Sequence, residues 1–194
     1  WDRYLEHTSS LWVLHWQLVR DARRATIFSW VFSNPRPSRF ARDQLLEELL
    51  QLARDTKTRA RSMSTLKKDL EVFLRSYVSQ RPGQGPLPEE ALLSPLTRLR
   101  LLRPTSERGV FELVEGLHPS LPLLVFEAAL VDYLRHRRSH SSGHHVVSLD
   151  ELLYGTWSPG RMFRLSPEGL IERLEALCQR APDRYLFDDT AGLR

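Results

Sequence analysis

The chain has 194 residues, of which 41% are hydrophobic and 27% charged, which is typical of a globular protein forming one large domain or two small ones. It contains no run of about twenty apolar residues and no signal-peptide pattern, which excludes the membrane-spanning and secreted classes of protein. The net charge of +4 is almost all arginine excess and favours an anionic partner, because the planar guanidinium binds phosphate oxygens well. The single cysteine, Cys178, is expected to be a small core residue in a reducing, cytoplasmic setting.

Two segments near the start are dense in aromatic residues. Residues 9–20 begin at a serine and are apolar nearly all round, which predicts a helix buried on most sides. Residues 25–32 form a second aromatic stretch, which the following prolines end. His15 is expected to be a hydrogen-bonded core histidine. We expect the aromatic rings to form a core and not a base-stacking platform, because their helical spacing points inward: Trp12, Trp16, Phe28, Trp30 and Phe32.

Residues 41–78 have the pattern of two helices joined by a short basic connector. Ser64 is the expected N-cap of the second helix, whose apolar residues recur on one face. At about 100° per residue the opposite face carries Ser64, Lys68, Glu71 and Arg75. Hydroxyls and cations on that face predict the reading helix of a helix-turn-helix. The alternative is a core helix whose solvent face is basic, and Glu71 mildly favours it.

The next segment favours the nucleic-acid interpretation. Residues 80–90 hold three prolines and two glycines and predict a loop, and residues 91–102 predict a short helix. The sequence Ser-Glu-Arg-Gly, followed by alternating residues at 110–114, predicts a β-hairpin. A hairpin placed after a helix-turn-helix is the wing of a winged helix.

The C-terminal half repeats this plan in miniature. Pro122 predicts the start of a helix, serines at 148, 158 and 166 predict three more, and Tyr185–Phe187 alternates as a strand. Arg161 and Arg164 then occupy the place of a second reading surface. The segment at 135–145 has four histidines, but no carboxylate or thiolate is interleaved, so we expect a solvated loop with phosphate-contacting arginines and no metal site.

The sequence therefore predicts a mainly α fold with small β-hairpins, arranged as tandem winged-helix-like units. Residues 1–117 would hold the aromatic helical core and the first unit, and residues 118–194 the second. Because the chain opens on Trp1 and stops straight after a turn-like sequence, we expect a fragment of a longer protein. The DNA-binding residues that we expect are Arg59, Arg61, Ser64, Thr65, Lys67, Lys68, Arg75, Arg161 and Arg164.

Several phrases, taken in order, resemble a known bacterial family: LWVLHWQLV at 11–19, STLKKDL at 64–70, LSPLTRL at 93–99, SLPLLVFEAALVDY at 120–133, SLDELLYGTWSPGRMFRL at 148–165 and the closing DDTAGLR. That family is labelled a domain of unknown function, is encoded beside DNA phosphorothioation genes, and includes SspB-type DNA nickases. Its members carry a further N-terminal segment, which is absent here.

The resemblance implies a DNA-binding component of an anti-phage phosphorothioation system, which nicks one strand of duplex DNA before sulfur insertion. Implied partners are a cysteine desulfurase, a sulfurtransferase-like enzyme and an ATPase. A nickase would use a divalent metal such as Mg²⁺ or Mn²⁺, or a nucleophile with its base. The acids are scattered on helices with no metal-ligand spacing, so the residues predict no catalytic set: Glu127, Asp132, Asp150 and Glu151. A non-catalytic DNA-binding scaffold or transcriptional regulator, or a protein whose basic faces bind an acidic partner, stays open.

Overall fold

The computed structural model describes residues 7–23, 25–55, 62–78, 94–138 and 146–187, and the chain forms two compact units. Unit 1 is built from residues 36–114, and unit 2 from residues 7–35 together with the chain after residue 114. The division after residue 114 lies close to the expected one at residue 117. The two aromatic segments belong to the C-terminal unit, which differs from the prediction. No helix in the described ranges is long and apolar enough to cross a membrane.

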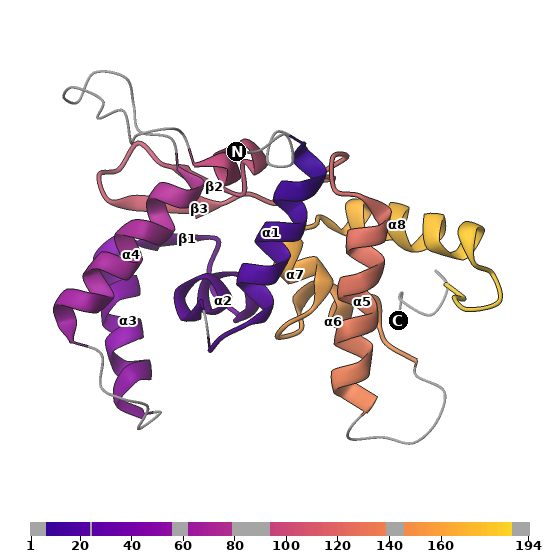
Figure 1. The fold of residues 1–194 in the computed structure, drawn as a ribbon, viewed down its shortest axis with the longest axis horizontal. Helices are drawn as coiled ribbons and strands as arrows, with labels where there is room; N and C mark the ends of the chain where they lie inside the picture. Colours follow the sequence, from indigo (N-terminus) through magenta and orange to yellow (C-terminus); the bar gives the residue numbers. More distant parts are fainter. Residues whose placement is uncertain (1–6, 24, 56–61, 79–93, 139–145, 188–194) are drawn as a thin grey trace. The chain divides into compact units, whose positions relative to one another are not determined.

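Unit 1 contains the predicted helix pair followed by the predicted hairpin (Figure 1). Its elements are β1 (Arg39–Ala41), α3 (Arg42–Asp55), α4 (Met63–Tyr77), the 3-10 helix η1 (Pro95–Leu99), β2 (Leu102–Pro104) and β3 (Val110–Leu113). The three strands form an antiparallel sheet in the order β1-β3-β2, with Phe111 opposite both Phe40 and Pro104. Gly109 turns the hairpin at a φ of 76°, a conformation that glycine adopts without a steric cost. The hairpin prediction is confirmed, whereas the helix predicted at 91–102 is a single 3-10 turn within the described part of that segment.

The apolar face of α4 packs into the core of unit 1, against α3 and η1. Leu66, Leu70, Phe73 and Tyr77 are buried, as their spacing predicts. They meet buried leucines on the neighbouring helices, namely Leu45, Leu49, Leu96 and Leu99. The expected cap at Ser64 is wrong by two residues. Ser62 is the N-cap and accepts a hydrogen bond from the Thr65 backbone N–H at 3.2 Å, because the extended backbone ends at Ser62.

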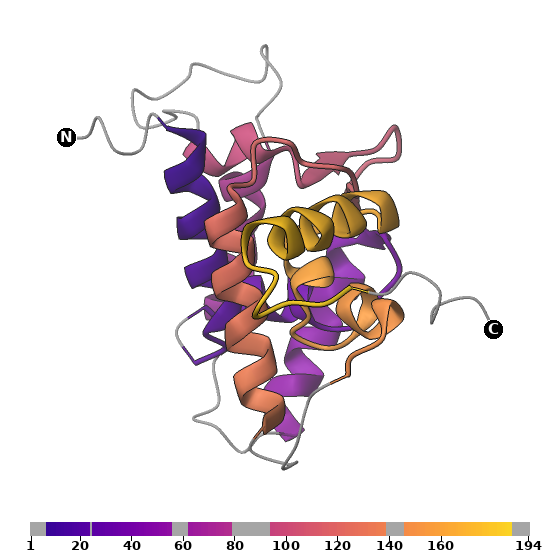
Figure 2. The same ribbon diagram turned by 90° about the vertical axis from the view of Figure 1, so that its right-hand side faces the viewer.

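The regular elements seen in the described residues of unit 2 are all helices (Figure 2). They are α1 (Thr8–Arg20), α2 (Thr26–Ser33), α5 (Leu123–Arg138), α6 (Leu149–Tyr154), α7 (Pro159–Phe163) and α8 (Pro167–Arg180). Helix α1 packs against α2, α5 and α7, and α5 packs also against α8. Trp12 and Phe32 are fully buried, whereas the other three predicted core aromatics are half-buried, namely Trp16, Phe28 and Trp30. The aromatic core is thus confirmed in its two central members.

The second winged-helix-like unit is not found in the described residues of unit 2. Tyr185–Phe187 has no strand partner there, and the β-type pairing seen is an isolated parallel bridge between Gly116 and Leu165. The helix starts are confirmed, since Ser148, Ser158 and Ser166 each accept a hydrogen bond from a first-turn backbone N–H. Helix α1 begins at Thr8, with His7 as its N-cap. The loop expected at 135–145 is helical over 135–138, at the end of α5, and His140, His144 and His145 lie outside the described residues.

The sequence Ser-Pro-Gly-Arg at 158–161 fixes the packing of α7 against α6. Ser158 caps α7 and Pro159 occupies its first turn, where a missing N–H has no cost. A Cβ atom at Gly160 would lie 2.6 Å from both the Leu152 carbonyl oxygen and the Leu153 Cα. These are backbone atoms that cannot move aside, so only glycine permits this approach of the two helices. Part of the motif behind the family resemblance is therefore structural.

His15 lies in the centre of unit 2 and is completely buried, as predicted. Its Nε2 lies 2.8 Å from the Met162 carbonyl oxygen, and its ring packs edge-on against Phe32 at 4.8 Å between centroids. Burial lowers the pKa of His15 to about 4, from an ordinary value near 6.5. The neutral ring is the form that the folded protein keeps.

This burial makes stability depend on pH. In the unfolded chain His15 becomes protonated below about pH 6.5, whereas in the folded chain it stays neutral down to about pH 4. Lowering the pH from 7 to 4.5 should therefore reduce the free energy of unfolding by roughly 2 to 3 kcal/mol through His15. Urea unfolding at the two pH values should show this loss for the wild type and a smaller one for His15→Gln. Identical losses in both proteins, or an NMR titration of the wild-type ring with a midpoint near 6.5, would contradict it.

Candidate nucleic-acid interface

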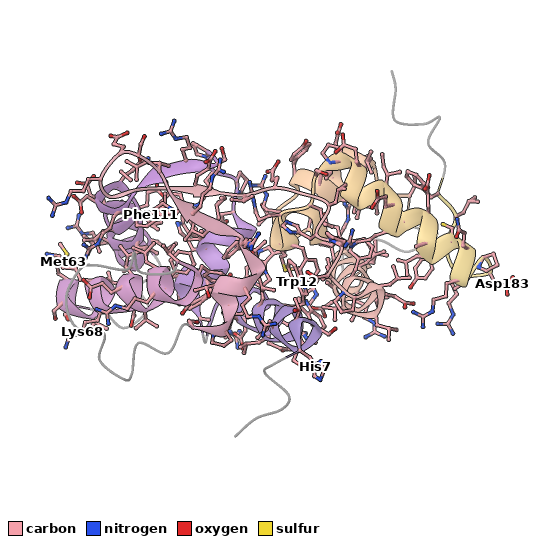
Figure 3. All side chains as sticks on the ribbon, turned by 90° about the horizontal axis from the view of Figure 1, so that it is seen from above. His7, Trp12, Met63, Lys68, Phe111 and Asp183 are labelled. Atoms are coloured by element: carbon pink, nitrogen blue, oxygen red, sulfur yellow. The ribbon has the colours of Figure 1, made fainter. Side chains whose placement is uncertain are left out.

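The solvent face of α4 carries a continuous stripe, which we call the α4 stripe: Ser64, Thr65, Lys67, Lys68, Val72 and Arg75. All six residues are exposed, and Figure 3 shows Lys68 at the outer side of α4. From Ser64 to Arg75 the stripe extends about 16 Å at 1.5 Å per residue, which exceeds the roughly 12 Å width of the DNA major groove. No ion pair within the described residues involves Lys67, Lys68 or Arg75.

Glu71 favoured the alternative in which this face does not bind nucleic acid, because it is acidic. In the structure Glu71 has a counter-ion. Its Oε1 accepts a hydrogen bond from Nη2 of Arg42 at 2.9 Å. The pair joins α3 to α4, and both side chains are about half-exposed. Arg42 thus neutralises the carboxylate beside the stripe. We did not predict this role for Arg42 from the sequence, because Arg42 and Glu71 are 29 residues apart.

The hairpin that follows carries an exposed cation at its tip. Arg108 lies at the tip, directly before Gly109, and its side chain is exposed. The turn is held by Thr105, whose hydroxyl lies 3.1 Å from the Val110 carbonyl oxygen and accepts from the Glu107 backbone N–H at 3.2 Å. Arg103 points to the partner strand and pairs with Glu112 at 2.7 Å. Arg108 was not among the residues predicted from the sequence, although an arginine before a turn glycine places a cation at a hairpin tip.

The two arginines expected in unit 2 are engaged inside the fold. Arg161 donates to the Tyr154 carbonyl oxygen at 3.0 and 2.6 Å and to the Asn34 carbonyl oxygen at 3.2 Å. Arg164 is only 5% exposed and is paired with Glu115. Burial lowers the pKa of Arg164, and the Glu115 carboxylate offsets part of that shift. These contacts hold unit 2 together, so we do not retain Arg161 and Arg164 as a reading surface. Arg59 and Arg61 lie outside the described residues.

Three of the four scattered acids of unit 2 also have partners. Glu127 accepts from the Tyr185 hydroxyl at 3.1 Å, Asp132 pairs with Arg20 at 3.2 Å, and Glu151 pairs with Arg137. In the part of the chain that the structure describes, no three histidine, cysteine, aspartate or glutamate side chains gather as a metal ion requires. The described residues therefore provide no three-ligand protein cage for Mg²⁺ or Mn²⁺.

Comparisons with known proteins agree with this architecture. The family described as "Protein of unknown function (DUF4007)" matches residues 1–194. A solved structure described as "Magnesium ion-bound SspB crystal structure" is 25% identical, with a TM-score of 0.75 over 93% of this chain and 53% of that one. One described as "SspB crystal structure" is 27% identical, with a TM-score of 0.76 over 97% of this chain and 55% of that one. This chain thus spans about half the length of those structures. No curated protein sequence matches.

Proposed function

The chain belongs to the DUF4007 family, and from that premise we propose that it is the DNA-binding component of a bacterial DNA phosphorothioation system. The observation that carries the proposal is the α4 stripe. It puts three cations and two hydroxyls on the open face of one helix, with the opposite face fixed in a core. Because the core already fixes the helix backbone, these cations can neutralise DNA phosphates with no further ordering of the backbone of α4.

The architecture of unit 1 supports a winged-helix mode of binding. Helix α4 follows α3 and precedes the β2–β3 hairpin, and β1 adds to the outer edge of β3. In this proposal α4 is the recognition helix and the hairpin, with Arg108 at its tip, is the wing. The wing would contact the backbone while α4 enters the major groove.

Strand nicking is the finer part of the proposal. Two structures described as SspB, one of them magnesium-bound, are similar to this chain, and the family resemblance implies a nickase. We assign DNA binding to the α4 stripe and assign no catalytic residue. The cysteine desulfurase, the sulfurtransferase-like enzyme and the ATPase are the proposed partners. The second candidate function is a non-catalytic scaffold or transcriptional regulator. The α4 stripe supports this function equally, because a scaffold or regulator needs only to bind DNA.

The double substitution Lys68→Ala with Arg75→Ala tests the binding surface. Removing two phosphate contacts should weaken affinity for any duplex on the order of tenfold at 100 mM salt and lower the slope of log K against log [salt] by about two. Fluorescence anisotropy with a labelled duplex measures both quantities. The matched control is Arg23→Ala with Arg184→Ala, which removes the same charge from exposed positions in unit 2. Equal losses in both double variants would show that net charge, and not the α4 stripe, controls binding.

Glu71 offers a substitution of the opposite sign. Glu71→Gln removes a negative charge beside the stripe and releases Arg42, so duplex affinity should rise several-fold, and more at low salt than at high salt. Because the ion pair is half-exposed, its loss should reduce the free energy of unfolding by only about 0.5 kcal/mol. Anisotropy and thermal unfolding measure the two effects. Unchanged or weaker binding would place the DNA away from α4.

Nicking is separated from scaffolding by incubating supercoiled plasmid with the chain and either Mg²⁺ or Mn²⁺. A nickase should convert the plasmid to open circles, and the Lys68→Ala, Arg75→Ala variant should do so more slowly because it binds less DNA. Agarose gels read the conversion, with EDTA as the control. Binding without conversion would leave this chain with the scaffold function.

A further inference from the structure

One member of the α4 stripe has neither a charge nor a hydrogen-bonding group with which to contact phosphate. Val72 is 58% exposed, although valine is an apolar, β-branched residue with a modest helix propensity. Projected at 100° per residue, Val72 lies about 40° around the helix from Lys68 and about 60° from Arg75. Both cations lie on the same side of it around the helix, so Val72 lies at the edge of the cationic face and, along the helix axis, between Lys68 and Arg75.

Val72 is the exposed apolar side chain on its turn of α4. The hydroxyl of Ser76, one turn later, donates back to the Val72 carbonyl oxygen at 2.7 Å. That hydroxyl is thus occupied by the helix backbone, so the two methyl groups of Val72 are the outward feature at this level. The isopropyl group itself offers a base edge no hydrogen-bond donor or acceptor.

We propose that Val72 determines specificity by contacting the C5-methyl group of thymine in the major groove, an inference that rests on the DNA-binding function proposed above. Polar base edges pressed against an isopropyl group would lose their water without a replacement hydrogen bond, which is unfavourable. Among unmodified bases, the apolar feature of the major groove is the thymine methyl, and the minor groove has no methyl group at all. Lys68 and Arg75 hold the flanking phosphates or purine edges while Val72 packs on the methyl.

The test compares duplexes that differ only in this methyl group. Poly(dA-dT) and poly(dA-dU) have the same minor-groove edges, and competition anisotropy at fixed salt gives the ratio of their affinities. The wild type should prefer the thymine polymer by about fourfold for each methyl that becomes buried. Val72→Ser should bind both polymers equally, and Val72→Thr, which keeps one methyl, should retain part of the preference. Leu124→Ser, at an apolar position that is 61% exposed in unit 2, is the matched control and should keep all of it.

The outcomes separate this inference from the proposed function. A wild type without a thymine preference, or a preference that survives Val72→Ser, overturns the role of Val72. The DNA-binding function still stands in both cases if Lys68→Ala with Arg75→Ala weakens binding to both polymers. Unchanged affinity in that double variant overturns the binding surface, and a thymine preference that Val72→Ser also leaves unchanged overturns the inference with it. A wild type that binds neither polymer also overturns both and would leave the stripe to a protein partner.

Discussion

Burial of one face of α4 is the constraint on which the candidate site depends. Leu66, Leu70, Phe73 and Tyr77 are almost completely buried, and each contributes about 1.5 to 3 kcal/mol relative to an exposed position. The half-exposed Arg42–Glu71 pair contributes less than about 1 kcal/mol. The core therefore sets the rotation of α4, and the ion pair acts on the charge of the surface. Lys68 and Arg75 face the solvent because turning the helix would expose four large side chains.

Structural features that depend on local interactions could be predicted from local sequence patterns. The period of the apolar residues gave the buried face of α4, turn chemistry gave the β2–β3 hairpin, and serines before prolines gave the starts of α7 and α8. Partners distant in the chain were not predictable in this way. Strand β1 pairs with β3 about 70 residues later, and α1 packs with helices that begin after residue 120. No periodicity encodes such contacts, because they depend on how whole elements meet.

Arg75 and Arg164 show the same limit at the level of single side chains. Both are arginines on or beside short basic stretches, and both were expected to bind DNA. Arg75 is exposed on α4, whereas Arg164 is buried against Glu115, 49 residues away. Burial of a guanidinium is costly unless its charge or its N–H groups find partners, and Glu115 supplies one here, so the acid and the arginine belong to one structural feature. The charge of a residue predicts what it can bind, and its burial decides whether it is available to do so.

This distinction also explains what family membership contributes. Gly160 lets α7 approach α6, and Arg161 binds two backbone carbonyl groups, so the Ser-Pro-Gly-Arg motif builds the scaffold of unit 2. A shared motif of that kind predicts a shared architecture and does not by itself identify a chemical step. The function has to be argued from groups that the fold leaves exposed. Many arginines of this basic chain are paired within the fold, including Arg20, Arg36, Arg103 and Arg164. The positive field of the described surface is therefore better represented by the α4 stripe, where the neighbouring acid is neutralised, than by the net charge.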